Sequence, residues 1–300
     1  MPVDVNRPGP WNHRNLTARG TRFHVALAGP EAPSGSGVLT LLIHGFPECW
    51  WTWRHVIPAL AQAGHRVAAL DLRGFGGSDR PPSGYDLVTL AQDIAAVVRS
   101  LGHERAMVIG AGLGGQVAWA LPHVAPDLTR AIVPVGAPHP LALRSLRSRA
   151  LSGPALQYAS LQIPGLAERR LRSRSALEGL LRSWAGPHTR EALAEEAPYY
   201  AELLSRPGAA RSALEPLRNL ILSRAETAAL ERPVTVPVLS VQGQLDPVQP
   251  AQAYARDTHH VTGNLHQATI RRSGHFPQEE APAELVRALM PFLAEVAPAV

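Results

Sequence analysis

The chain has 300 residues, of which 45% are hydrophobic, and its mean hydropathy is −0.05. This composition is that of an ordinary globular protein and excludes a chain that is disordered throughout. All 29 basic residues are arginine, which excludes lysine chemistry such as a Schiff base or a Walker A phosphate loop. The single cysteine, Cys49, excludes an intrachain disulfide and a cysteine-based zinc or iron–sulfur site.

The basic charge is concentrated in one region of the chain. The whole sequence carries a net charge of +5, and residues 141–190 contain nine arginines against two glutamates. The other 250 residues carry 20 arginines and 22 acidic residues, so they are slightly acidic. Because no nucleic-acid recognition motif is present, basicity alone supports only salt-sensitive association with nucleic acid. We expect region 141–190 to bind an anionic membrane surface or an acidic protein instead.

Strand and helix signals alternate over the first 140 residues. Period-two and short apolar runs predict strands, and longer segments with helical spacing that end at glycine predict helices. The predicted strands are 21–27, 38–43, 66–70, 106–109 and 131–135, and the predicted helices are 53–63, 88–101 and 113–125. Such alternation predicts a doubly wound, mostly parallel sheet with helices on both faces.

The pattern changes after residue 140. From 141 to 232 the chain has helix-like stretches separated by proline and glycine, with no convincing strand. Strand signals return at 236–241 and 266–271, followed by a predicted helix at 283–296. We therefore expect an α/β core formed by residues 1–140 and 233–300, with a helical lid inserted at 141–232.

The sequence has no apolar run of about 18 residues and no apolar stretch near its start, which predicts neither a transmembrane helix nor a secretory signal. We expect a cytoplasmic protein that needs no metal or cofactor.

The segment Gly110-Ala111-Gly112-Leu113-Gly114-Gly115 matches G-x-G-x-x-G, the fingerprint of dinucleotide-binding domains. Two features argue against that interpretation. At least two strand units precede the motif, and no acidic residue ends the next strand, where one would bind the ribose. The alternative is a tight strand-to-helix turn in which small residues allow close backbone approach.

Three segments together resemble the epoxide-hydrolase branch of the α/β-hydrolase superfamily. Residues 44–53 read HGFPECWWTW and continue to RGFGGSDRP, as in the HGxP-to-RGxGxS segment of soluble epoxide hydrolases. VQGQLD at 241–246 resembles the turn that carries the acid of the catalytic triad, and SGHFPQEEAP at 273–282 resembles the loop that carries the histidine. The resemblance covers about residues 12–140 and 233–297 and places the insertion at 141–232 where the family has its lid.

The resemblance implies a role for each matching residue. In this family a carboxylate on the sharp turn opens the epoxide and forms an ester, which a histidine-activated water then hydrolyses. His275 corresponds to that general base and Asp246 to the acid that orients it. The backbone amides of Phe46 and Leu113 correspond to the oxyanion hole. The HGxP motif (His44, Gly45, Pro47) shapes the loop that carries Phe46.

The sequence departs from the family at the nucleophile. The turn should read G-x-Nu-x-G-G, and its nucleophile position is Gly112, which has no side chain to form an ester. Ala111 and Leu113 also replace the histidine and tryptophan that the family often has on either side. The lid tyrosines that would donate to the epoxide oxygen have only weakly registered candidates, namely Tyr158, Tyr199 and Tyr200.

Two hypotheses remain open. In the first, the chain is an epoxide-hydrolase relative that retains His275 and Asp246 but has lost, or nearly lost, covalent epoxide and ester hydrolysis. In the second, it is a non-catalytic protein that binds a small apolar molecule under the lid, or a membrane or partner through the basic lid. Fold-level analogy alone does not decide between them.

Overall fold

The computed structural model describes residues 4–31, 37–144, 159–218 and 222–297. One sheet of eight strands forms its centre, in the order β1-β2-β4-β3-β5-β6-β7-β8. The first two strands form an antiparallel hairpin, β2 pairs antiparallel with β4, and every other pairing is parallel. The strands are β1 (Asn12–Ala18), β2 (Thr21–Ala28), β3 (Val38–Ile43), β4 (Arg66–Leu70), β5 (Arg105–Ala111), β6 (Thr129–Val135), β7 (Val238–Gly243) and β8 (Leu265–Ile270).

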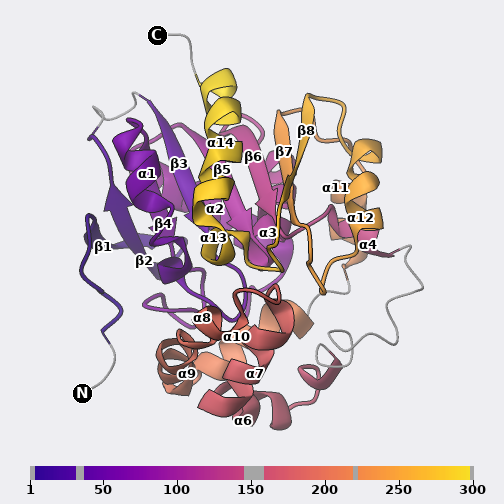
Figure 1. Cartoon of the computed structure of the whole chain (residues 1–300). Coiled ribbons are helices and arrows are strands. Elements are labelled where there is room, and N and C mark those ends of the chain that lie inside the picture. Colours follow the sequence, from indigo (N-terminus) through magenta and orange to yellow (C-terminus); the bar gives the residue numbers. More distant parts are fainter. Residues whose placement is uncertain (1–3, 32–36, 145–158, 219–221, 298–300) are drawn as a thin grey trace.

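The central strands are apolar along their whole length because both faces of the sheet are covered. Strand β3 reads VLTLLI, and its residues from Leu39 to Ile43 are all buried. Continuous apolar runs of this kind are typical of parallel strands between two helical layers. Helices α2 and α3 pack against each other, and α14 crosses in front of the sheet (Figure 1). The core helices are α1 (Ile57–Gln62), α2 (Leu87–Ser100), α3 (Leu113–Val124) and α14 (Pro282–Val296).

The second group of helices lies across one end of the sheet, where Figure 1 shows it below the strands. It comprises α6 (Leu166–Leu171), α7 (Arg174–Trp184), α8 (Arg190–Ala194), α9 (Ala197–Ser205) and α10 (Ala209–Arg218). We call these five helices the lid. Two further helices of the same stretch of sequence, α4 (Pro140–Arg144) and α11 (Arg224–Leu230), pack against each other. They also contact the core, because α11 packs against α3 and α4 packs against α12 (Ala251–Ala255).

The predicted fold class is confirmed: the chain forms a doubly wound, mostly parallel sheet covered by helices. Several elements differ from the sequence prediction. Strand β1 was not predicted, because its outer residues are polar and exposed at the sheet edge. The helix predicted at 53–63 is instead a 3₁₀ turn, η1 (Trp50–Trp53), followed by the shorter α1, which has Pro58 in its first turn.

The remaining differences are short elements near the C-terminal strands. Strand β7 begins one residue after Pro237, which has no N–H to donate to a sheet. The short helices α12, η3 (Asp257–His259) and α13 (Pro277–Glu280) also escaped the prediction, since three to five residues carry too little periodicity. Within the described ranges, no helix is both long and apolar enough to span a bilayer.

Candidate active site

Gly112 forms the sharp turn between strand β5 and helix α3. Its backbone has φ of +47° and ψ of −111°, and its N–H donates to the Val135 carbonyl at 2.9 Å. A positive φ of this kind is strained for residues that carry a side chain. The turn therefore has the strand–turn–helix geometry in which α/β hydrolases present a nucleophile.

Three other glycines of this turn are required by close backbone approach. A Cβ atom would lie 2.2 Å from the Gly114 oxygen if placed on Gly110, 2.4 Å from the Ile43 oxygen if placed on Gly114, and 2.4 Å from the Ala137 Cβ if placed on Gly115. Gly112 is different. The nearest atom to a Cβ there is Nε2 of His275 at 3.4 Å, which is an ordinary contact.

His275 and Asp246 are brought together from the ends of two neighbouring strands. Asp246 follows β7 and His275 follows β8, and His275 Nδ1 lies 3.0 Å from Asp246 Oδ2. The other carboxylate oxygen, Oδ1, accepts the N–H groups of Val248 and Gln249, which fixes its orientation. This contact gives the imidazole a defined orientation, with Nε2 directed at Gly112.

The electrostatics around His275 favour its protonated form. Burial alone would lower the pKa of the imidazole, but the negative charges of Asp246, Glu48 and Glu280 outweigh it and raise that pKa above its ordinary value. Only 7% of His275 is exposed. Such a shift favours a role in proton transfer near neutral pH.

The HGxP segment lies against the turn from the other side. His44 is fully buried, its Nδ1 lies 2.6 Å from the Gly45 carbonyl, and its Nε2 accepts the Leu72 N–H. Both ring nitrogens are thus engaged in fixing the loop. Gly45 Cα lies 3.7 Å from the Cβ position of Gly112, and the following Phe46–Pro47 peptide bond is cis. His44, Gly45 and Pro47 therefore shape the site rather than provide reacting groups.

Two backbone N–H groups next to the turn have no acceptor within the part of the chain that the structure describes. They belong to Phe46 and to Leu113, the first residue of helix α3. Helix α3 has 12 residues, so its N-terminus adds a partial positive charge at the same place. The arrangement can stabilise a developing negative charge beside Gly112 and His275.

Trp184, at the end of lid helix α7, contacts His275 in two ways. Its carbonyl accepts the His275 N–H at 2.9 Å, and its ring meets the imidazole edge-to-face with centroids 5.5 Å apart. Sequence analysis missed this residue because the lid sequence aligns poorly with any family pattern.

Glu280 also fixes the histidine loop. Its Oε2 accepts the N–H groups of Gly274 at 2.9 Å and Gly186 at 2.7 Å, and its Oε1 accepts that of Phe276 at 3.0 Å. Gly186 belongs to the lid, so one carboxylate joins the lid to both sides of His275. In the sequence, the position of Glu280 five residues after His275 was the only signal that it could fix this loop.

Glu48 is a buried carboxylate near the site. Its Oε1 accepts from the Thr52 hydroxyl and from Gln278 Nε2, and only 2% of the residue is exposed. Burial is the main cause that raises the pKa of Glu48 to about 7, against a smaller opposing effect of Thr52 and His275. Part of the Glu48 population is therefore neutral at physiological pH.

The tyrosine candidates in the described residues are engaged away from the turn. The Tyr200 hydroxyl donates to Glu279, and the Tyr199 ring packs against Trp51 and under the Arg7 guanidinium. No hydrogen bond or ring contact within the described ranges joins either tyrosine to Gly112 or His275. Tyr158, the third candidate, lies outside the described residues.

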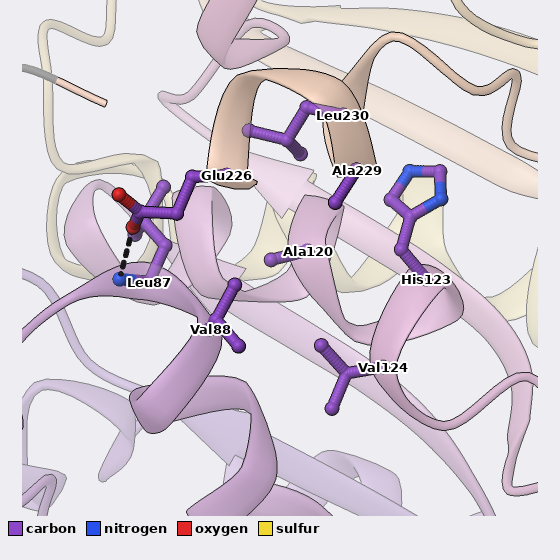
Figure 2. Close-up of a pocket in the computed structure, with 8 residues that line it drawn as sticks. All are labelled: Leu87, Val88, Ala120, His123, Val124, Glu226, Ala229 and Leu230. Atoms are coloured by element: carbon purple, nitrogen blue, oxygen red, sulfur yellow. Dashed lines mark hydrogen bonds between the residues drawn. The ribbon is translucent and has the colours of Figure 1, made fainter. Parts of the chain in front are cut away.

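A small pocket lies at the opposite end of helix α3 (Figure 2). Its wall is mostly apolar, and its one carboxylate, Glu226, accepts the Leu87 and Ser223 N–H groups. The full lining is Leu87, Val88, Ala120, His123, Val124, Glu226, Ala229 and Leu230. Over the residues that the structure describes, no group of three or more His, Cys, Asp or Glu side chains could hold a metal ion.

Comparison with known proteins places the chain in a family. Residues 40–282 match the family described as alpha/beta hydrolase fold. Epoxide hydrolase A of Mycobacterium tuberculosis is 31% identical over 95% of this chain and 98% of its own length. Epoxide hydrolase B of the same organism is 44% identical over 128 residues, which span 42% of this chain and only 35% of that protein.

A solved structure titled as an epoxide hydrolase from an endophytic Streptomyces has a TM-score of 0.79 and 29% identity, over 96% of this chain and 97% of that one. The match of fold and sequence along nearly the whole chain shows that the protein belongs to the α/β-hydrolase family, as an epoxide-hydrolase-like member.

Proposed function

We propose that this chain is an epoxide-hydrolase relative in which Gly112 occupies the nucleophile position, so that covalent hydrolysis of epoxides is lost or reduced by orders of magnitude. The observation that carries the proposal is the 3.4 Å between the Cβ position of Gly112 and Nε2 of His275. The base faces the place where a nucleophile would begin, and no side chain is there.

The retained groups support a limited chemistry. His275, oriented by Asp246, can take a proton from a water molecule, and the amides of Phe46 and Leu113 can stabilise an oxyanion. When triad enzymes lose the nucleophile, only the residual rate supplied by binding and oxyanion stabilisation remains. A pocket that binds an apolar small molecule without turning it over is the limiting case of this proposal.

The test is the hydration of styrene oxide by the wild type and by Gly112→Asp. We expect wild-type turnover near the uncatalysed background and a gain of at least about 100-fold in the aspartate variant, because nucleophile, base and oxyanion amides then act together. Gly112→Asn is the matched control, since it has the same shape without the nucleophilic carboxylate. Turnover by the wild type at an ordinary enzyme rate of about 1 s⁻¹ or more would overturn the proposal.

A second candidate function is binding of an anionic membrane through the lid. Ile163 and Leu166 are large hydrophobic residues that are 51% and 42% exposed. Leu166 begins α6 and Ile163 precedes it by three residues, and the exposed arginines Arg169, Arg170 and Arg172 follow. Figure 1 shows α6 on the side of the lid away from the strands. Exposed apolar side chains flanked by arginines can bind the interfacial region of an anionic bilayer. In the cytoplasmic location that we infer, the inner leaflet would supply that charge.

Vesicle co-sedimentation tests the second candidate. We expect binding to phosphatidylserine vesicles that is released by salt and lost when Arg169, Arg170 and Arg172 are replaced by glutamine. Arg14→Gln, an exposed arginine on β1, is the control and should bind like the wild type. Binding that persists without the lid arginines would contradict the candidate, and binding to an acidic protein but not to vesicles would replace it.

A further inference from the structure

Residues 4–11 lie ahead of the first strand and contain no helix or strand of their own. The Trp50 indole donates to the Val5 carbonyl at 3.0 Å, and the Trp11 indole donates to the Arg7 carbonyl at 2.9 Å. The Trp11 and Trp50 rings meet edge-to-face, with centroids 5.3 Å apart. The main chain of this segment is therefore bound to the core, on the same side of the view as lid helix α9 (Figure 1).

A chain of polar contacts continues from this segment into the core. His13 Nε2 lies 2.9 Å from the Arg7 carbonyl oxygen, and His13 Nδ1 lies 3.0 Å from His24 Nε2. His24 Nδ1 in turn lies 2.8 Å from Asp71 Oδ2, and both of these residues are buried. The other carboxylate oxygen of Asp71 accepts the Trp50 N–H at 2.7 Å. All of these distances are those of hydrogen bonds, so the Arg7 main chain is connected to a carboxylate in the interior.

The side chain of Arg7 leaves the core and reaches the lid. Its guanidinium carbon lies 4.2 Å from the centroid of the Trp51 ring, in the core, and 4.3 Å from that of the Tyr199 ring, in lid helix α9. Its Nη1 lies 3.5 Å from Oε2 of Glu196, the residue that precedes α9. A guanidinium is attracted to the faces of aromatic rings, and more strongly where water is partly excluded. Arg7 thus joins a ring of the core to a ring and a carboxylate of the lid.

The two ends of the lid are attached to the core in different ways. At the α7 end, the Trp184 carbonyl accepts the His275 N–H, and a Cβ atom on Gly274 would lie 2.3 Å from the Gly186 nitrogen. These are backbone contacts, which no rotation of a side chain can release. The contacts of Arg7 at the α9 end are made by a side chain that is 35% exposed, and such side chains change rotamer readily.

We propose that residues 4–11 are a strap that fastens lid helix α9 to the core through Arg7. The lid opens at α9 when the guanidinium leaves the Trp51 and Tyr199 rings, while the α7 end stays in place beside His275. Such an opening breaks a few side-chain contacts and leaves the sheet intact, so it needs far less free energy than global unfolding. The inference does not depend on which reaction, if any, the site performs.

Hydrogen–deuterium exchange of the native chain, followed by mass spectrometry, tests the strap. In Arg7→Leu we expect the amides of α9 (197–205) to exchange at least about tenfold faster than in the wild type, because the variant loses both ring contacts and the charge. The amides of α7 (174–184) and α2 (87–100) should stay within about twofold of the wild type. Arg14→Leu is the matched control, since this arginine is exposed on β1, and its exchange should equal that of the wild type in all three helices.

A second variant tests the same contact from the lid side. Tyr199→Leu removes the lid ring and should also accelerate exchange in α9. If Arg7 acts through Tyr199, the double variant should exchange in α9 no more than about twofold faster than the faster single variant, because both substitutions remove one contact. Rates that multiply in the double variant would show that Arg7 does not act on the lid through this ring, and would overturn the inference.

Three other results would overturn it as well. Unchanged exchange of α9 in Arg7→Leu would show that the segment does not fasten the lid. Equal acceleration of α7 and α9 would show that the lid opens as one body. Equal acceleration of α2 and α9 would show that residues 4–11 support the whole fold. None of these measurements involves an epoxide, so each outcome is separate from the test of the proposed function.

Discussion

Gly186 of the lid and Gly274 of the histidine loop pack backbone against backbone: a Cβ atom on Gly274 would lie 2.3 Å from the Gly186 nitrogen. The Glu280 carboxylate accepts the N–H of both residues. The position of the loop that carries His275 therefore depends on the lid, although the two segments are almost 90 residues apart in the sequence.

Replacing Gly186 by alanine should separate the lid from this loop. The new Cβ would lie 2.7 Å from the Arg272 carbonyl oxygen, so we expect a loss of about 2 kcal/mol or more in the free energy of unfolding and shifted NMR signals of His275. Gly179→Ala is the matched control. Gly179 lies in lid helix α7 with open space around it, and alanine there should stabilise the protein by about 0.5–1 kcal/mol. Equal effects of the two substitutions would contradict the prediction.

The glycines of the strand-to-helix turn should respond unequally to alanine. At Gly114 the Cβ would lie 2.4 Å from the Ile43 oxygen and 2.7 Å from the His44 oxygen, so Gly114→Ala should cost several kcal/mol or prevent folding. At Gly112 only the positive φ opposes a side chain, and Gly112→Ala should cost about 1–2 kcal/mol. Urea denaturation of both variants measures the difference. A Gly112→Ala variant as unstable as Gly114→Ala would show that the turn cannot hold a side chain.

Asp246 should control the ionisation of His275. Burial favours the neutral imidazole, and the Asp246 carboxylate at 3.0 Å is the largest effect that opposes it. Asp246→Asn removes that charge, so we expect the pKa of His275 to fall by about one unit or more in an NMR titration. Asp79→Asn, which removes an exposed carboxylate paired with Arg22, should leave this pKa unchanged. A His275 pKa that is the same in Asp246→Asn and the wild type would refute the pairing.

Glu48 should make the stability of the protein depend on pH. Its pKa is about 7 in the folded chain against 4.5 ordinarily, so the unfolded chain ionises first as the pH rises. The contribution of Glu48 to the free energy of unfolding is largest below pH 4.5, where its carboxyl group is neutral in the folded and the unfolded chain. This contribution is lost as the pH rises through 7, and the total fall is roughly 3 kcal/mol at most.

Glu48→Gln removes this ionisation together with its influence on the pKa of His275 and Glu279. Glu279, whose pKa burial raises to about 8, contributes a slope of the same sign in both proteins, so the informative quantity is the difference between variant and wild type. We expect the free energy of unfolding of Glu48→Gln to increase relative to that of the wild type as the pH rises from 4.5 to 7. Urea denaturation of both proteins at each pH measures this difference. A difference in the free energy of unfolding that does not change with pH would contradict the raised pKa of the buried Glu48.

The sequence predicted the elements that carry strong periodicity and the residues that carry a motif. Strand β3 and helix α3 were predicted nearly to the residue, because an unbroken apolar run and a glycine boundary mark them. Asp246 and His275 were named from short motifs at strand ends, and the structure brings the two together. The family resemblance implied that pairing, and the fold achieves it because neighbouring parallel strands end at one edge of the sheet.

Contacts between segments distant in sequence could not be predicted in this way. The carbonyl of Trp184 accepts the N–H of His275, and a backbone acceptor has no signature in the sequence. Glu280 was unremarkable as a residue type, since its role depends on where Gly186 of the lid is placed. The raised pKa of Glu48 follows from complete burial, which a polar residue between Pro47 and Cys49 does not indicate by itself.

The positive φ of Gly112 makes this turn a place where stability and catalysis would compete. A side-chain-bearing residue at a positive φ is held in a conformation that such residues disfavour. Glycine adopts the same conformation without that strain. If the proposed function holds, the residue that leaves the turn without a nucleophile is also the one that relaxes its backbone, and selection for a robust fold would favour the same glycine.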